Sequence, residues 1–254
     1  MKKFSFLVLI FTAVTVSNVQ AQSFTDIFDT IFVNVSRTDA TTGVLYDRVI
    51  PISSLRQFSG SNPDTANMYQ FLYGFHELYN AAFDTTKRLP FDGDSLENLI
   101  SNSAYVDIGI LHYRFNVIDT LVAKQKLYFG IDSVLFENTS VSASLYNETT
   151  VLLISPFKDA LYENNVTFRF ASLFHFDNTN NPITQLQVNF DDGNGWQTVG
   201  LNSTITVNYP MDGVYTLCFI ATYSNGQSDT CYAKIISSSI QYAGSSCTAP
   251  PFQT

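Results

Sequence analysis

Cysteine, tryptophan and charged residues are scarce in this chain of 254 residues. It contains 3 Cys and 1 Trp, and only 14% of its residues are charged. The 13 Lys and Arg form no cluster and are outnumbered by 22 Asp and Glu, so the net charge is −9. A nucleic-acid partner needs a face dense in Lys and Arg that neutralises phosphates. The composition therefore argues against nucleic-acid binding and predicts a solvated, acidic surface.

Long hydrophobic runs are also absent after the first residues. Lys2 and Lys3 precede an apolar run from Phe4 to Val16, and Val19-Gln20-Ala21 follows it. This order is typical of a signal peptide, here 1–21, which is cleaved before Gln22. The run is shorter than the roughly 20 apolar residues that span a bilayer. We therefore expect a protein that is secreted or at the cell surface, with no transmembrane segment.

Recognisable catalytic motifs are missing. The chain has no Gly-x-Ser-x-Gly elbow and no glycine-rich phosphate loop, and His76-Glu77 lacks the second His of a zinc-binding helix. His112 and His175 lie in segments dominated by aromatic and aliphatic residues, where a structural histidine is expected. The sequence therefore predicts a protein that is not an enzyme and has no cofactor, apart from the calcium considered below.

What the chain does contain is β-rich. Hydrophobic residues make up 45% and aromatic residues 15% of it, which is typical of a folded protein. From Leu186 to Ile236, short alternating segments are separated by turns such as Asp192-Gly193 and Asn225-Gly226. This pattern predicts a small β-sandwich. Further strands are expected at 27–35, 106–118, 151–154 and 166–170.

One long helix interrupts the strands. Asn62 is expected to cap it, with Pro63 in its first position, and its apolar residues recur at three- and four-residue spacing to about Phe83. The fold class that we expect is mainly β with a helical insertion. The mature chain would form a mixed α+β domain at 22–180 and an immunoglobulin-like sandwich at 181–240, which a Ser- and Pro-containing tail at 241–254 follows. The Asn-rich run 177–182 is the expected junction.

Two cysteines flank the Asn225-Gly226 turn. A hairpin would bring Cys218 and Cys231 near one another, so a disulfide is possible. A slip of one residue in the register would place the two side chains on opposite faces. Cys247 is left over in the tail.

Two candidate binding sites stand out. Asp191, Asp192 and Asn194 offer closely spaced oxygen ligands that suit Ca²⁺, although Asp-Gly and Asn-Gly are also ordinary hairpin turns. Tyr69, Tyr73 and His76 form a row on the flank of the expected helix, where they would stack against sugar rings or be covered by a sheet.

The C-terminal part contains, in this order, Val188-Asn189-Phe190-Asp191-Asp192-Gly193, Val207-Asn208-Tyr209 and Gly213-Val214-Tyr215-Thr216-Leu217. With these segments it resembles the polycystic-kidney-disease-type (PKD) domain, an immunoglobulin-like sandwich. The resemblance covers about a fifth of the chain. Asp191 stands where the family has its first Gly, and Asn208 stands where it has a His. The resemblance implies a spacer or a module that binds glycans or proteins.

The N-terminal part has a helical patch, then strands and an Asn-rich link, and the sandwich follows it. In this layout it looks like the leading region of long secreted proteins of the Bacteroidetes. We therefore predict a secreted binding or interaction protein that presents a β-sandwich surface to a polysaccharide or an exported protein. The alternatives are the accessory region of a surface hydrolase without its catalytic module, and a structural spacer.

Overall fold

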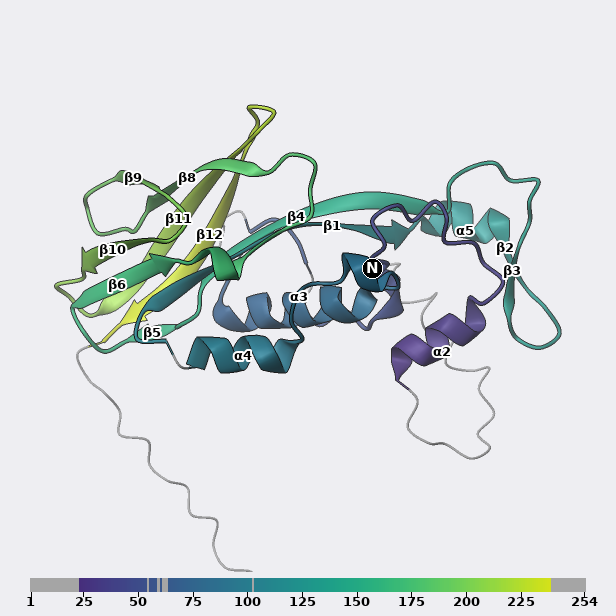
Figure 1. Ribbon diagram of the computed structural model, residues 1–254, viewed down its shortest axis with the longest axis horizontal. Coiled ribbons are helices and arrows are strands. Elements are labelled where there is room, and N and C mark those ends of the chain that lie inside the picture. The colour runs from purple at the N-terminus through teal and green to yellow at the C-terminus, as the bar shows by residue number, and fades with distance from the viewer. Residues whose placement is uncertain (1–22, 54, 59, 61–63, 102, 239–254) are drawn as a thin grey trace, which may run out of the picture. The chain divides into compact units, whose positions relative to one another are not determined.

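The computed structural model describes residues 23–53, 55–58, 60, 64–101 and 103–238 (Figure 1). The expected signal peptide, the tail with Cys247 and the expected helix cap Asn62 lie outside these residues. The described part is mainly β and contains four α-helices, which confirms the expected fold class at this level. None of the described helices is long and apolar enough to cross a membrane.

Local capping explains where three of the helices begin. The α-helices are α2 (Phe24–Ile31), α3 (Met68–Ala81), α4 (Gly93–Ser101) and α5 (Thr120–Lys126), with 3₁₀ turns η1 (Tyr46–Arg48), η2 (Thr85–Lys87) and η3 (Ser172–Phe174). Before α2, Ser23 and Asp26 form a capping box. Asn67 and Gln70 exchange side-chain to backbone hydrogen bonds of 2.9 and 3.1 Å before α3. Asp119 accepts bonds from two backbone N–H groups at the start of α5.

Two expectations about these segments are wrong. Residues 27–35 were expected to form a strand, but residues 27–31 lie in α2, and Phe28 of this helix stacks on its C-cap residue Phe32 at 4.0 Å between ring centroids. The spacing of four residues places both rings on one helix face. The long helix begins at Met68 rather than near Asn62, because Ala66 instead pairs with Ala233 in a parallel bridge.

The strands form two larger sheets and one hairpin. Their bounds are β1 (Val106–Ile118), β2 (Leu127–Phe129), β3 (Leu135–Glu137), β4 (Tyr146–Pro156), β5 (Ala160–Leu161), β6 (Asn165–Phe170), β7 (His175–Asp177), β8 (Ile183–Asn189), β9 (Trp196–Val199), β10 (Ser203–Asn208), β11 (Gly213–Tyr223) and β12 (Ser228–Ser237). One sheet has the order β10-β6-β1-β4, with β7 paired to β1. The other has the order β5-β12-β11-β8-β9, and β2 pairs with β3 alone. The expected strands at 106–118, 151–154 and 166–170 are confirmed.

Contacts divide the chain into two compact units that differ from the expected domains. The first comprises Met1–Leu55, Tyr73–Asp94 and Tyr113–Val151, and the second comprises Arg56–Leu72, Ser95–His112 and Leu152–Thr254. The expected junction near residue 180 therefore falls inside the second unit. The reason is strand pairing, because β10 joins β6 and β12 joins β5 across that point in the sequence.

The core of the second unit lies between its two sheets. Phe168 of β6 contacts Phe190, which follows β8, at 4.9 Å between ring centroids. The Ile154 N–H of β4 donates to the Cys231 thiol of β12 at 3.3 Å. These side chains are fully buried. Burial of each large apolar side chain stabilises a fold by about 1.5–3 kcal/mol, so this layer holds the two sheets together.

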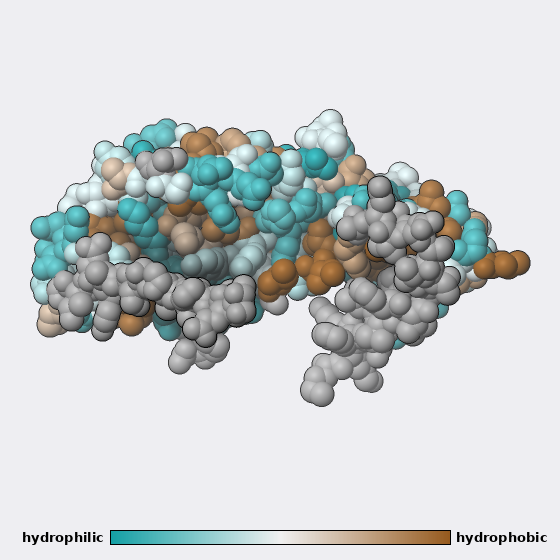
Figure 2. Space-filling model, turned by 90° about the horizontal axis from the view of Figure 1, so that it is seen from below, coloured by the Kyte–Doolittle hydropathy of each residue, from teal (hydrophilic) through white to brown (hydrophobic). Residues whose placement is uncertain are grey.

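The first unit has a core of its own. Phe28 of α2 and the C-cap residue Phe32 pack there with Leu45, Ile118 and Leu145, all of them buried. The hairpin of β2 and β3 belongs to this unit and has exposed apolar residues at Tyr128, Phe129 and Ile131. Figure 2 shows hydrophobic surface at the right-hand end of the view, where Figure 1 places this hairpin.

Candidate binding surface

The outward side of the strands β9, β8, β11 and β12 is a largely uncharged surface that the second unit builds from regular structure. We call it the outer sheet face. Alternate residues of these strands, such as Val188, Phe219 and Ala233, are buried in the core, so the residues between them point outward. The outer sheet face comprises Trp196 and Thr198; Gln185, Gln187 and Asn189; Val214, Thr216, Cys218, Ile220 and Thr222; and Ser228, Thr230, Tyr232, Lys234 and Ile236.

Strand register places one aromatic residue at each end of a row across this face. Trp196 is opposite Asn189, Asn189 is opposite Cys218, and Cys218 is opposite Tyr232. Three strand spacings separate the ends, a distance of about 14 Å. The next row is Thr198, Gln187, Ile220 and Thr230. Trp196 at one end is 47% exposed, whereas the Tyr232 ring at the other end is only partly exposed, because Gly60 packs against it. Amide and hydroxyl groups along the rows donate and accept hydrogen bonds.

The outer sheet face is almost free of charge. Of its members, only Lys234 is charged, in a protein with a net charge of −9. Protein surfaces commonly have about 25–35% charged residues. A surface with so few charges does not select strongly charged partners, because electrostatic complementarity requires opposite charges on the two sides. It suits a neutral polar ligand.

The predicted aromatic row on the long helix is exposed. Tyr69, Tyr73 and His76 all lie on α3 with their side chains exposed. The His76 ring approaches the Gly93 backbone, where an added Cβ would lie 2.5 Å from its Nδ1. Binding by these three residues stays a prediction.

The three predicted calcium ligands lie in the turn between β8 and β9. The Thr216 N–H donates to the Asp191 carboxylate at 3.0 Å. Both carboxylate oxygens of Asp192 accept bonds from Asn194, at 3.1 and 2.8 Å. Asp191 has a φ of 60°, and Gly193 and Gly195 also have positive φ, so these residues build the turn. The calcium site stays a prediction.

The possible disulfide between Cys218 and Cys231 is not formed. Both thiols are free. The register pairs Cys218 with Tyr232 and Phe219 with Cys231. Cys231 is therefore opposite the residue that follows Cys218, and the two cysteine side chains lie on opposite faces of the sheet. Burial raises the pKa of the Cys231 thiol to about 12 and also raises the pKa of Cys218. Neither thiol is activated as a nucleophile.

A buried His-Asp pair is the arrangement that most resembles catalytic chemistry. His112 Nδ1 lies 3.0 Å from the Asp177 carboxylate, and Thr179 Oγ1 lies 3.3 Å from the same nitrogen. In a nucleophilic triad, the acid and the hydroxyl contact different nitrogens of the imidazole. Here both contact Nδ1, and Thr179 also donates to Asp177 at 2.7 Å. The arrangement is therefore that of a structural turn.

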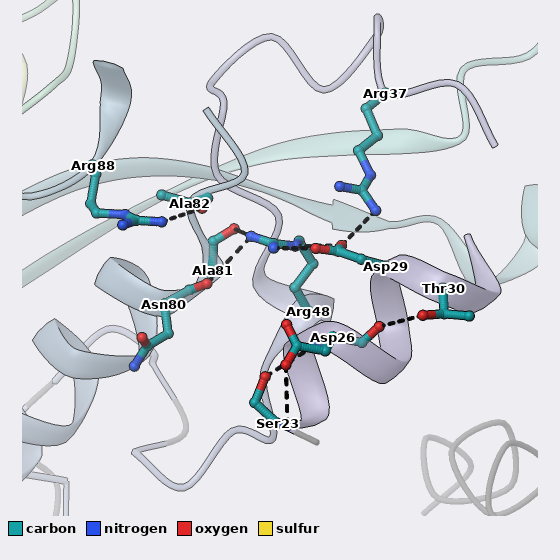
Figure 3. Close-up of polar contacts among 10 residues, drawn as sticks. All are labelled: Ser23, Asp26, Asp29, Thr30, Arg37, Arg48, Asn80, Ala81, Ala82 and Arg88. Atoms are coloured by element: carbon teal, nitrogen blue, oxygen red, sulfur yellow. Dashed lines mark hydrogen bonds and ion pairs between the residues drawn. The ribbon is translucent and has the colours of Figure 1, made fainter. Parts of the chain in front are cut away.

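An ion-pair cluster of the first unit, formed by Asp29, Arg37 and Arg48, also has a structural role (Figure 3). Arg48 is buried and binds the Asp29 carboxylate through two nitrogens at 2.9 and 2.6 Å. Arg37 binds the same carboxylate at 2.6 Å. Arg48 also donates to the backbone oxygens of Asn80 and Ala81 at the end of α3. It thus satisfies carbonyl groups that the helix end leaves without partners.

The outer sheet face was not predicted from the sequence, although one signal for it was present. The strict alternation between Val214 and Ile236 separates inward from outward residues. The rows, however, depend on which strands are neighbours. No family model matches the chain, and no curated protein resembles it significantly in sequence.

Proposed function

We propose that this protein is an exported, non-enzymatic binding protein whose outer sheet face holds a neutral polysaccharide chain. The observation that carries the proposal is the row from Trp196 to Tyr232 on a surface with one charged residue. Aromatic side chains combine an apolar ring with a polar group, and the amides and hydroxyls between them match the hydroxyl groups of a sugar chain.

The strand arrangement supports the proposal that this surface belongs to an immunoglobulin-like sandwich. The sheet order β5-β12-β11-β8-β9 includes a short strand, β5, that runs parallel to β12, and β10-β6 contribute to the opposite sheet. Sandwiches of this class place two antiparallel sheets face to face and present their outer faces to solvent. The sheet that carries the outer sheet face fits this class, whereas the opposite sheet differs from it, because β1 pairs in parallel with both β6 and β7. The PKD-type resemblance of residues 188–217 agrees with this arrangement.

An exported protein is the second candidate ligand. Val214 and Ile236 are paired across β11 and β12 at one end of the outer sheet face, and both are exposed. Apolar side chains that meet in this way favour contact with a protein rather than with a sugar. A partner that is lost when Val214 is replaced by Ser, but is retained when Trp196 is replaced, would favour this second candidate.

The experiment is a pull-down with insoluble neutral polysaccharides, together with a glycan array. We expect binding by the unmodified protein and a loss of about tenfold or more in Trp196→Ala, since removal of an aromatic anchor commonly costs 2 kcal/mol or more. Leu173→Ala is the control, because Leu173 and Trp196 are both 47% exposed and only Trp196 lies on the outer sheet face. Absence of any binding would instead favour the spacer, and equal binding by both variants would contradict the proposed site.

A further inference from the structure

A concave site lies in the same unit, at the edge of the sheet where β5 pairs with β12. It is a cleft of about 420 Å³ beside the first residues of β1 and β6. Its lining includes Tyr105, Lys158, Tyr162, Glu163, Asn165 and Thr167. Small-molecule sites commonly have volumes of about 300–1,000 Å³. The cleft is therefore large enough for a short segment of a ligand.

Tyr105 forms one aromatic wall of the cleft, and Arg169 contacts its ring. The Arg169 guanidinium lies 4.8 Å from the centre of the Tyr105 ring. Arg169 is itself fixed by the buried Asp107 carboxylate, at 2.5 and 2.9 Å, and by Ser103 at 3.3 Å. Tyr105 stays 40% exposed. A stack of this kind fixes the ring orientation before a ligand arrives, which lowers the entropy cost of binding.

A second tyrosine lines the same cleft from the segment after β5. Tyr162 is 50% exposed, whereas its neighbour Leu161 is buried. The Leu161 carbonyl accepts a hydrogen bond from the Ser238 N–H at 2.9 Å, and Ala160 pairs with Ile236 of β12. The backbone under Tyr162 is therefore anchored to the sheet, while the ring lies at the surface.

The polar lining offers both donors and acceptors and no net charge. Lys158 and Glu163 line the cleft with opposite charges, and within the described residues neither forms an ion pair. The side-chain Oδ1 of Asn165 accepts a hydrogen bond from the Asn208 side-chain amide at 2.7 Å, so the Asn165 side-chain nitrogen keeps donor capacity. Thr167 shares a hydrogen bond of 3.0 Å with Thr206. Neighbours on β10 thus position the polar side chains of β6.

We propose that this cleft binds a short neutral oligosaccharide, or the end of a neutral glycan chain, as a site separate from the outer sheet face. Two exposed tyrosine rings would pack on the apolar faces of sugar rings. Lys158, Glu163 and Asn165 would donate to and accept from the hydroxyl groups. Glu163 beside a single Lys disfavours polyanions, because a site for an anionic chain requires an excess of positive charge.

The test uses saturation-transfer NMR and calorimetry on the purified protein. The probes are soluble hexasaccharides of glucose, mannose, galactose and xylose. We expect at least one of them to bind, with a loss of about tenfold or more in Tyr162→Ala. Tyr128→Ala is the matched control, since Tyr128 is similarly exposed but lies on the hairpin of the first unit. Circular dichroism would verify that each variant is folded.

Trp196→Ala separates this inference from the proposed function. Binding in the cleft predicts that hexasaccharide affinity is unchanged in Trp196→Ala, whichever result the insoluble polysaccharides give. The inference is overturned if no hexasaccharide binds, if Tyr162→Ala binds as tightly as the unmodified protein, or if only Trp196→Ala weakens binding.

Discussion

The imidazole of His112 stacks on the ring of Tyr223, with 4.5 Å between ring centroids and 11° between the planes. His112 lies on β1 and Tyr223 ends β11, so the stack joins the two sheets of the second unit. The Tyr223 hydroxyl donates to Asp229 at 2.9 Å, and His112 contacts Asp177. The stacked pair therefore stabilises the packing of the two sheets at the end of β11.

Replacing His112 by Leu should destabilise the protein by about 1–3 kcal/mol, because the partly buried Asp177 carboxylate loses a hydrogen-bond partner. Burial acts to raise the pKa of Asp177, but its bonds from His112 and Thr179 outweigh this and hold the pKa below its usual value. Urea denaturation followed by circular dichroism measures the change. The control is His76→Leu on the exposed side of α3, which should stay within about 0.5 kcal/mol. Equal stabilities of the two variants would contradict the role of His112.

The ion pairs of Asp29 should make stability depend on pH. Burial acts to raise the pKa of Asp29, but Arg48 and Arg37 outweigh it, so the pKa lies below the ordinary value of 3.8. The contribution of these ion pairs to the free energy of unfolding is therefore complete above pH 3.8 and is lost as the pH falls through the lowered pKa. We expect Asp29→Asn to reduce the free energy of unfolding by about 1–2 kcal/mol at neutral pH, a value limited by the screening of this partly exposed carboxylate.

Unfolding titrations at several pH values measure this difference. It should shrink below pH 3.8, whereas the exposed Asp39→Asn should show little change at any pH. A difference that stays constant down to the most acidic pH would contradict the assignment to these ion pairs.

Cys218 and Cys231, the two cysteines among the described residues, should stay reduced and react slowly. Cys231 is fully buried and hydrogen-bonded to Ile154, so we expect alkylation by iodoacetamide only after unfolding. Cys218 is half-buried and should react first. Mass spectrometry of peptides after alkylation distinguishes the two sites. A peptide pair linked between Cys218 and Cys231 would contradict the register of β11 and β12.

Gly109 in β1 leaves room for two aromatic rings. A Cβ at this position would lie 2.3 Å from Phe157 and 2.7 Å from Phe71, whose rings meet edge to face at 5.0 Å. Gly109→Ala should therefore destabilise the protein by about 1–3 kcal/mol through overpacking. Gly200→Ala is the control, since no atom lies within 4 Å of its added Cβ. Thermal unfolding compares them, and equal melting temperatures would contradict this packing.

Much of the secondary structure could be predicted because its signals are local. The strand at 106–118 was expected with the bounds that β1 has, and the alternation after Leu186 matches β8 to β12. The helix at Phe24–Ile31 was missed, although Ser23 and Asp26 form the capping box that marks its start. Its apolar residues were interpreted with the period of a strand, and a short segment permits both interpretations.

The candidate sites depend less on local signals than the strands do. Tyr69, Tyr73 and His76 are exposed as a row on one helix, and binding by them stays a prediction. The cleft at Tyr105 and Tyr162 had no signal in the sequence, because its walls come from segments more than 50 residues apart and Arg169 holds one of them in place.

The sequence by itself determined the β-rich composition, the strand alternation and the positions of the turns, because these depend on neighbours within a few residues. Only the tertiary structure decided that β10 joins β6, that β12 joins β5 and that the two cysteines face opposite sides. Strand partners and register follow from burial of side chains across the whole unit, since a slip of one residue would exchange the core and the surface.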